Sequence, residues 1–260
     1  MQIKTPSARG PFDIVGDVHG CLDELLALMA SLGYQVDRQG REFEVIPLQG
    51  RTLVLAGDLA NRGPDTVGVL RLVMQMARTG NAICVPGNQD MKLIEAMKGS
   101  RVQPTPGLAR SLEQFARETV DFRAATVEFL EMLPSHLVLD DGKLVIAHAG
   151  LPERMQGSNS ARARAFALAG ETTGSIDTFG LPVRLNWAAD YRGRALVAFG
   201  HTPVTEPLWL NNTVNIDTGC VYGGFLTALR YPDLDTVQVA ARAVYYPSRK
   251  CFPPNRVLAR

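Results

Sequence analysis

The first half of the chain alternates between short, mostly apolar runs and segments with the apolar spacing of helices. Residues 12–15, 51–56 and 82–85 have the length and composition of buried strands. Helical spacing follows the first two runs, at Leu22, Leu25, Leu26 and Met29 and again at Val67, Leu70, Met74 and Ala77. A third helix is expected over residues 91–97. Repeated strand, loop and helix units predict an α/β fold containing parallel strands.

The second half of the chain changes from helical to strand periodicity. Helical spacing continues through residues 108–115 and 122–133, and then residues 137–139 and 144–146 flank Asp141-Gly142, which predicts a β-hairpin. Further strands are expected at residues 43–46 (an edge strand), 195–199, 213–217, 225–229 and 236–239.

Residues 151–194 show neither period. They are rich in Gly, Arg, Ser and Thr, and a connection of this length in a compact domain is usually functional or a small subdomain. We therefore expect one domain over residues 1–260, with residues 151–194 as a surface excursion.

Composition restricts the class of protein. The 260 residues are 46% hydrophobic and 20% charged, which allows a sizeable core, and the net charge of +1 gives no strong attraction for nucleic acid. No run approaches eighteen apolar residues and the first residues do not resemble a signal peptide, so we expect a cytoplasmic protein without a membrane partner. The four cysteines, without C-x-x-C spacing, are expected to be reduced and mostly buried.

Polar side chains follow the predicted strands at the points where ligands bind in α/β proteins. Six of them are metal-ligand types: Asp17, His19, Asp58, Asn88, His148 and His201. Oxygen and imidazole donors without thiolate suit manganese, iron or zinc. Two such ions about 3.5–4 Å apart polarise a phosphate and supply a metal-bound hydroxide for in-line attack. The alternative for each residue is an ordinary polar side chain in a loop.

The motifs around these residues resemble a known family. Gly16-Asp17-Val18-His19-Gly20, Gly57-Asp58 with Arg62-Gly63, Gly87-Asn88, His148-Ala149-Gly150 and Gly200-His201 are similar to the ordered motifs of calcineurin-like metallophosphoesterases, in the branch of the serine/threonine protein phosphatases. Residues 85–88, 164–168, 170–174, 187–194 and 215–220 further resemble the phosphatase domain of bacterial polynucleotide kinase-phosphatase, whose relatives include diadenosine tetraphosphate hydrolases and phosphoprotein phosphatases. No G-x-x-x-x-G-K-[ST] phosphate loop is present, so a kinase module is not expected in this chain.

The resemblance implies a two-sheet β-sandwich flanked by helices, with two metal ions at the strand ends. Asp17, His19 and Asp58 would hold the first ion, and Asp58, Asn88, His148 and His201 the second, with Asp58 bridging. Manganese is the first choice, with iron, zinc, nickel and cobalt as alternatives. Arg62 would bind the scissile phosphate through its planar fork of donors, and Asp217 would orient a ligand histidine.

Two positions depart from the family pattern. A histidine that protonates the leaving group normally follows Gly-Asn, and an aspartate that supports it normally precedes the arginine. This chain has Gln89 and Asn61 there. Amides do not exchange protons near neutral pH, and a positioned acid contributes roughly 10²–10⁴ in rate. Alkyl esters should therefore be hydrolysed poorly, whereas aryl esters and phosphoanhydrides have leaving groups that need less protonation.

Three functions remain open from the sequence. The first is hydrolysis of nucleotide or polynucleotide phosphates, including RNA ends, and the second is hydrolysis of phosphoproteins or diadenosine tetraphosphate. The third is a catalytically impaired module that binds metal and phosphate. The excursion carries six arginines and four acidic residues, a difference of +2, and could form a phosphate rim with Trp187 or Phe179 stacking on a base, or a solvated surface. The oligomeric state is left open.

Overall fold

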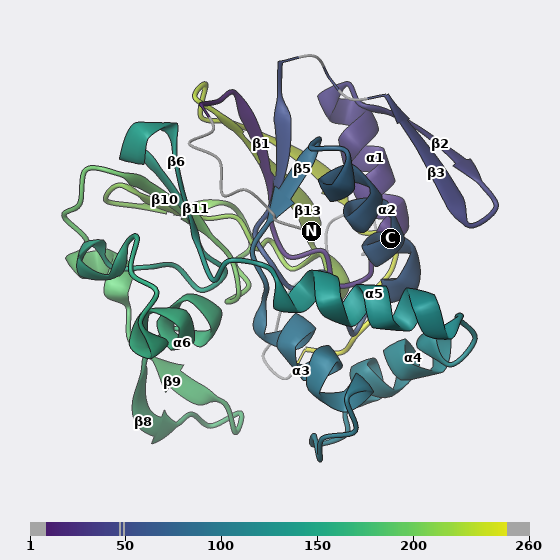
Figure 1. Ribbon diagram of the computed structural model, residues 1–260. Helices are drawn as coiled ribbons and strands as arrows, with labels where there is room; N and C mark the ends of the chain where they lie inside the picture. The colour runs from purple at the N-terminus through teal and green to yellow at the C-terminus, as the bar shows by residue number, and fades with distance from the viewer. Residues whose placement is uncertain (1–8, 47, 49, 249–260) are drawn as a thin grey trace.

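Two five-stranded sheets pack face to face at the centre of the molecule (Figure 1). The structure, a computed structural model, describes residues 9–46, 48 and 50–248. The first sheet has the order β14-β13-β1-β4-β5, formed by β1 (Phe12–Val15), β4 (Thr52–Leu55), β5 (Ala82–Cys84), β13 (Phe225–Tyr231) and β14 (Asp235–Ala240). The second has the order β11-β12-β10-β7-β6, formed by β6 (Leu137–Leu139), β7 (Leu144–Ile146), β10 (Leu196–Phe199), β11 (Leu208–Leu210) and β12 (Thr213–Asn215).

The inner strands of each sheet run parallel, which brings their carboxyl ends to one edge. In the first sheet β1 pairs with β4, and β4 with β5, in parallel register. In the second sheet β7, β10 and β12 are parallel neighbours. Side chains from both sheets, among them Ile14, Val54, Ile146 and Ala198, fill the space between them. The loops that leave these carboxyl ends therefore meet across the sandwich.

Helices cover the outer faces of both sheets (Figure 1). On the first sheet these are α1 (Leu22–Leu32), α2 (Thr66–Arg78), α3 (Asn88–Met97), α4 (Pro106–Phe115) and α5 (Val120–Glu131). The second sheet is covered by α6 (Ala161–Ala169). Local signals set several ends: Asp65 accepts a hydrogen bond from the Gly68 N–H at the start of α2, and Gly33 ends α1 at φ 103°. The predicted two-sheet sandwich flanked by helices is confirmed.

Some predicted boundaries were wrong. The edge strand expected at residues 43–46 is present as β3 (Glu42–Ile46), and among the described residues it pairs with β2 (Gln35–Gln39) in a hairpin separate from the two main sheets. The third helix begins at Asn88, three residues before the predicted start, and β11 was not predicted. The hairpin around Asp141 exists, but three consecutive residues from Asp140 have positive φ, so its turn is longer than type I′.

The excursion is largely ordered. It contains α6, a hairpin of β8 (Thr172–Ile176) with β9 (Pro182–Arg184), and a short 3₁₀ turn over Trp187–Asp190. The hairpin extends away from the sandwich beneath α6 (Figure 1). Among the described residues, no helix is long and apolar enough to span a membrane.

Candidate metal centre

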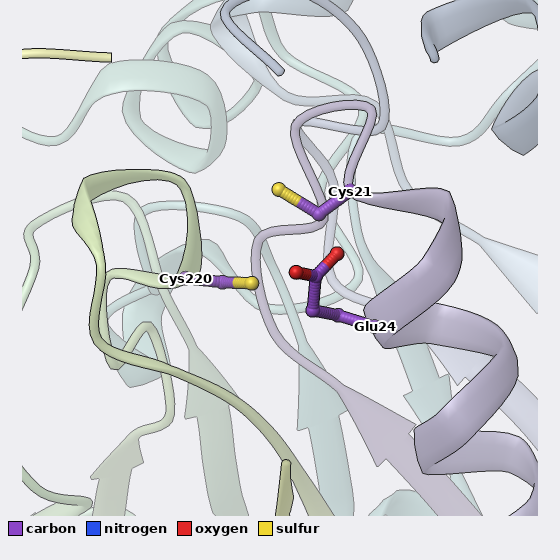
Figure 2. A group of neighbouring side chains, drawn as sticks. All are labelled: Cys21, Glu24 and Cys220. Atoms are coloured by element: carbon purple, nitrogen blue, oxygen red, sulfur yellow. The ribbon is translucent and has the colours of Figure 1, made fainter. Parts of the chain in front are cut away.

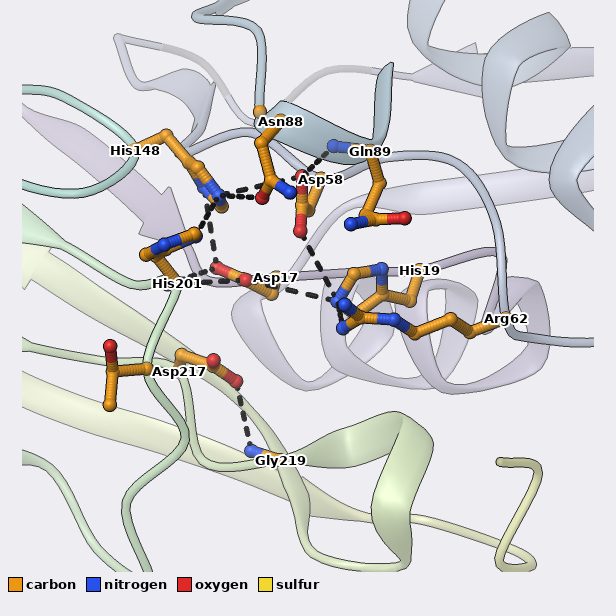
Figure 3. Close-up of polar contacts among 12 residues, drawn as sticks. Asp17, His19, Asp58, Arg62, Asn88, Gln89, His148, His201, Asp217 and Gly219 are labelled. Carbon is orange, nitrogen blue, oxygen red and sulfur yellow. Dashed lines mark hydrogen bonds and ion pairs between the residues drawn. The ribbon is translucent and has the colours of Figure 1, made fainter. Parts of the chain in front are cut away.

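The six candidate ligands come together where the strands of both sheets end (Figure 3). Asp17 and His19 follow β1, Asp58 follows β4, and Asn88 is the first residue of α3 after β5. His148 and His201 follow β7 and β10 of the other sheet. All except Asn88 and His201 are fully buried. The parallel strands therefore bring residues separated by up to 184 positions into one cluster.

The loops that carry these ligands pack backbone against backbone. A Cβ at Gly87 would lie 2.1 Å from Asp58 Oδ1, so no larger residue fits there without moving the carboxylate. The Gln89 N–H donates to the same oxygen at 2.8 Å. His19 and Asp58 both have φ of 47°, in the left-handed region that costs energy for residues other than glycine. Surrounding hydrogen bonds hold these conformations and fix the directions of the side chains.

Asp90 provides much of that support, and sequence reasoning did not single it out. Its carboxylate accepts hydrogen bonds from the backbone N–H groups of Leu59, Ala60 and Gly87, so it joins the loops after β4 and β5. The signal was available, because an acidic residue in the third position of a helix commonly forms a capping box. The same contact explains why the helix begins at Asn88.

The donor atoms form two groups that share one carboxylate. Asp17, His19 and Asp58 make one group, and Asp58, His148 and His201 make the other, with donor atoms within 4.8 Å of one another in each. Asn88 joins the second group, with its Oδ1 3.3 Å from His148 Nε2. One aspartate between two groups is the arrangement that a pair of metal ions with a bridging ligand requires.

The histidines of the cluster are held as neutral imidazoles. His19 Nδ1 lies 3.2 Å from the Ala60 carbonyl and His148 Nδ1 lies 3.1 Å from the Ala56 carbonyl. Each Nδ1–H donates to its carbonyl, which leaves the Nε2 lone pair directed into the cluster. Burial lowers the pKa of His19 to about 3 and lowers the pKa of His148 and His201. Neutral imidazoles with inward lone pairs suit cation binding.

Within the described ranges, a buried nitrogen without a partner and a group of crowded carboxylates also indicate a site for cations. His201 Nδ1 lies 3.0 Å from His148 Nε2, while the buried His201 Nε2 has no hydrogen-bond partner among the described residues. Burial, together with the nearby carboxylates of Asp217 and Asp58, raises the pKa of Asp17 well above its ordinary value. Burial also acts to raise the pKa of Asp58, but neighbouring His148, His19 and Arg62 outweigh it and lower the pKa to about 2. Divalent cations would neutralise these crowded carboxylates, so the donor set fits two such ions.

Arg62 lies at one end of the cluster. Its Nη1 is 2.8 Å from His19 Nε2, so the guanidinium reaches the donor atoms directly. Its Cζ lies 5.7 Å from the ring centroid of Tyr222 and 6.0 Å from that of Tyr246, within cation–π range. The two tyrosines, which the sequence did not identify, restrict the direction of the guanidinium.

The segment that carries Tyr246 is tied down by a buried carboxylate. Glu24 Oε1 accepts hydrogen bonds from the Tyr245 hydroxyl at 2.7 Å and from the Arg242 N–H at 2.9 Å. The backbone N–H groups of Tyr245 and Tyr246 both donate to the Val221 carbonyl. Through these contacts, α1 and residues 220–222 position the ring that packs on Arg62.

Asp217 lies beside Asp17, one of the candidate ligands. Its Oδ1 accepts from the Gly219 N–H at 3.1 Å, and its side chain is within hydrogen-bonding reach of Asp17. Burial raises the pKa of Asp217 to about 7. Among the described residues, no hydrogen bond joins Asp217 to a histidine. The described contacts of the Asp217 side chain are therefore with Gly219 and Asp17, and its role toward a histidine stays a prediction.

Asn61 and Gln89 remain paired, but through the backbone. Asn61 Nδ2 donates to the Gln89 carbonyl at 2.7 Å, and the buried Asn61 Oδ1 has no partner in the described part of the chain. The Gln89 side chain extends toward Asp58 and His19 (Figure 3). An amide thus occupies the position where the family pattern has a proton donor.

A second cluster lies at the start of α1. Cys21, Glu24 and Cys220 are buried with donor atoms within 4.8 Å of one another, and the two sulfur atoms lie on the same side of the Glu24 carboxylate (Figure 2). Cys21, Cys84 and Cys220 are buried free thiols, as the sequence predicts, and Cys251 lies outside the described residues. This cluster connects the loops of the metal centre to α1.

Comparison with known proteins identifies the family. The model of the calcineurin-like phosphoesterase family matches residues 10–240. The bis(5'-nucleosyl)-tetraphosphatase PrpE (asymmetrical) of Anoxybacillus flavithermus is 44% identical over 240 residues, covering 90% of this chain and 96% of that protein. The protein of the same name from Bacillus subtilis is 40% identical over 244 residues, covering 92% and 98%.

Solved structures show the same fold. A structure described as "a putative diadenosine tetraphosphatase" has a TM-score of 0.64 at 28% identity and covers 91% of this chain and 96% of that one. A serine/threonine phosphatase from Saccharomyces cerevisiae has a TM-score of 0.59 at 14% identity, covering 91% and 81%, which shows the fold alone. The chain therefore belongs to the calcineurin-like phosphoesterase family and is a metal-dependent phosphoesterase.

Proposed function

We propose that this enzyme cleaves a phosphoanhydride bond of a bis(5'-nucleosyl) tetraphosphate asymmetrically. The relatives of 40–44% identity carry this activity in their names, and they align over nearly their whole length. The observation in this chain that carries the proposal is the amide at Gln89. The leaving group of an anhydride is a phosphate, which is a weak base, so the reaction loses little when no acid protonates it.

We assign the six clustered residues as ligands of two divalent ions. Asp17, His19 and Asp58 would hold one ion, and Asp58, Asn88, His148 and His201 the other. Manganese fits the oxygen and imidazole donors, with iron, zinc, nickel and cobalt as alternatives. When bound, the ions supply Lewis acidity at phosphorus and activate water.

The protein's own groups bind and orient the substrate. The Arg62 guanidinium reaches the cluster at His19 and is directed by two tyrosine rings, so it is placed to bind an equatorial phosphate oxygen through its fork of donors. The Gln89 amide can donate a hydrogen bond but not transfer a proton. Asp217, next to Asp17, is a positioning residue that fixes the orientation of that carboxylate.

The second candidate is hydrolysis of phosphates at RNA ends, which the motifs at residues 164–174 and 215–220 favour. An alkyl leaving group would need protonation that Gln89 does not provide, and this places the candidate second. We also propose that residues 1–260 act as one domain, with the excursion beside the site. The buried free thiols support a location in the reducing cytoplasm.

The test is product analysis with the manganese-loaded enzyme. Diadenosine tetraphosphate should give ATP and AMP, with kcat/KM at least a hundredfold above that for an RNA 3'-phosphate or a phosphoserine peptide. Asp58→Asn is the blank, because it removes the shared carboxylate. Preference for the RNA end would overturn the proposal in favour of the second candidate, and equal rates on all three substrates would refute the argument from Gln89.

A further inference from the structure

A cavity of about 240 Å³ opens next to His201, on the side of the cluster away from Arg62. Figure 3 shows His201 and Arg62 at opposite ends of the donor atoms. The walls come from the end of β9, the segment that follows it, β10 and β11: Arg184, Leu185, Trp187, Phe199, Leu208 and Leu210. Gly200 and His201 form part of the lining, so the cavity is continuous with the metal centre.

The walls are mainly apolar and partly aromatic. The rings of Trp187 and Phe199 lie 5.2 Å apart at 60° and form one side. Leu208, also in the lining, is 52% exposed although its side chain is apolar. Exposed apolar side chains around a cavity typically mark a site that a ligand covers. The volume is below the roughly 300–1,000 Å³ of sites for drug-sized ligands, so it suits a flat fragment such as one nucleobase.

Trp187 contributes a wall and is not a free stacking platform. A Cβ at Gly150 would lie 2.0 Å from the indole, so the ring rests directly on that glycine. It also packs edge-on against Phe166 and Tyr191. Phe179, the other predicted stacking residue, is 51% exposed and does not line this cavity.

Arg184 places a positive charge in the lining of the cavity. His201 belongs to the same lining, and the positive charge of Arg184 acts to lower the pKa of both His201 and His148. Arg184 Nη1 donates to the Ala169 carbonyl, which connects the end of β9 to the end of α6. Glu171, the acidic residue in the lining, pairs with Arg162 at 3.1 Å. The charge facing the metal centre from this wall is therefore cationic.

We propose that this cavity is a nucleoside subsite, in which the apolar walls receive one base of the substrate and Arg184 binds the phosphate next to its ribose. The inference rests on the proposed function, because it requires a nucleotide at the metal centre. It assigns to the excursion a specific task, which is recognition of the leaving or the attacked nucleotide. Arg62 and Arg184 would then hold the phosphate chain from opposite ends of the cluster.

The test compares two inhibitors of p-nitrophenyl phosphate hydrolysis, AMP and ribose 5-phosphate, which share the phosphate and differ in the base. In the native protein the inhibition constant of AMP should be about tenfold lower, because its base buries apolar surface against the walls of the cavity. Leu208→Asp should reduce this ratio to below threefold. The matched control is Trp209→Asp, because neighbouring residues of a strand face opposite sides and Trp209 does not line the cavity.

Equal inhibition by both compounds in the native protein, or the same ratio in Leu208→Asp and Trp209→Asp, would overturn the subsite. If Leu208→Asp fails to fold, judged by circular dichroism, Leu185→Asp tests another residue of the lining in the same way. Neither measurement uses diadenosine tetraphosphate. A tenfold ratio without cleavage of that compound would therefore refute the proposed function and leave the subsite standing, and the reverse result would refute only the subsite.

Discussion

Replacing Gln89 by histidine should restore a proton donor to the site and change substrate preference. The side chain is 6% exposed and extends toward the donor cluster, while its backbone N–H bond to Asp58 does not depend on the side chain. The buried Asn61 Oδ1, which has no partner among the described residues, can accept from an imidazole N–H. Such a hydrogen bond contributes about 0.5–1.5 kcal/mol and would orient the new ring without a second substitution.

The expected gain is selective for poor leaving groups. A positioned acid contributes roughly 10²–10⁴ in rate, and a hundredfold gain corresponds to about 2.7 kcal/mol of barrier. We expect a gain of this size in kcat/KM for an alkyl ester such as phosphoserine, and less than about threefold for an anhydride, whose leaving group needs little protonation.

The assay is steady-state phosphate release from both substrates with manganese, for the native protein, Gln89→His and Gln89→Met. The methionine variant has a similar length and no transferable proton, so it should show no gain. Equal gains on the ester and the anhydride, or no gain on the ester in a folded, metal-loaded Gln89→His protein, would refute the reasoning.

Three further predictions follow from the contacts described. Elemental analysis after desalting should find one bound ion in His201→Ala and none in Asp58→Asn, because Asp58 is the residue that belongs to both donor groups. Two bound ions in either variant would contradict the assignment. Tyr245→Phe should lower the free energy of unfolding in urea by about 1.5–3 kcal/mol, because it removes a donor to the buried Glu24 carboxylate. The control, Tyr246→Phe, should change this free energy by less than about 0.5 kcal/mol, and equal effects of the two substitutions would be inconsistent with the contact. Ile14→Ala, which removes a side chain packed between the two sheets, should lower the free energy of unfolding by about 2–5 kcal/mol in the same assay. Ile46→Ala, at a side chain that is 57% exposed, should lower it by less than about 0.5 kcal/mol, and similar losses in the two variants would argue against the two-sheet core.

Several features of the site could be predicted because they are local. A strand followed by a polar loop and an amphipathic helix places the loop at the carboxyl end of the strand, so Asp17, Asp58 and Asn88 were expected at one edge. His148 and His201 were expected after later strands for the same reason. The spacing of apolar residues, which indicates the residues of a segment that are buried, depends only on the sequence of that segment.

Contacts between distant segments could not be predicted in this way, because they depend on which elements pack together. Nothing local indicates that Tyr246 lies over Arg62, or that residues 42–46 pair with 35–39 apart from the main sheets.

The sequence by itself determined the α/β class, the parallel strands and the identity of the ligand-type residues, because these follow from periodicity and residue chemistry. Only the tertiary structure decided that Asp58 is shared by two donor groups, that Asp217 contacts Asp17, and that Arg184 and Leu208 border one cavity. The physical reason is that the direction of a side chain depends on backbone angles and packing partners. Here those partners come from both sheets and lie far apart in the chain.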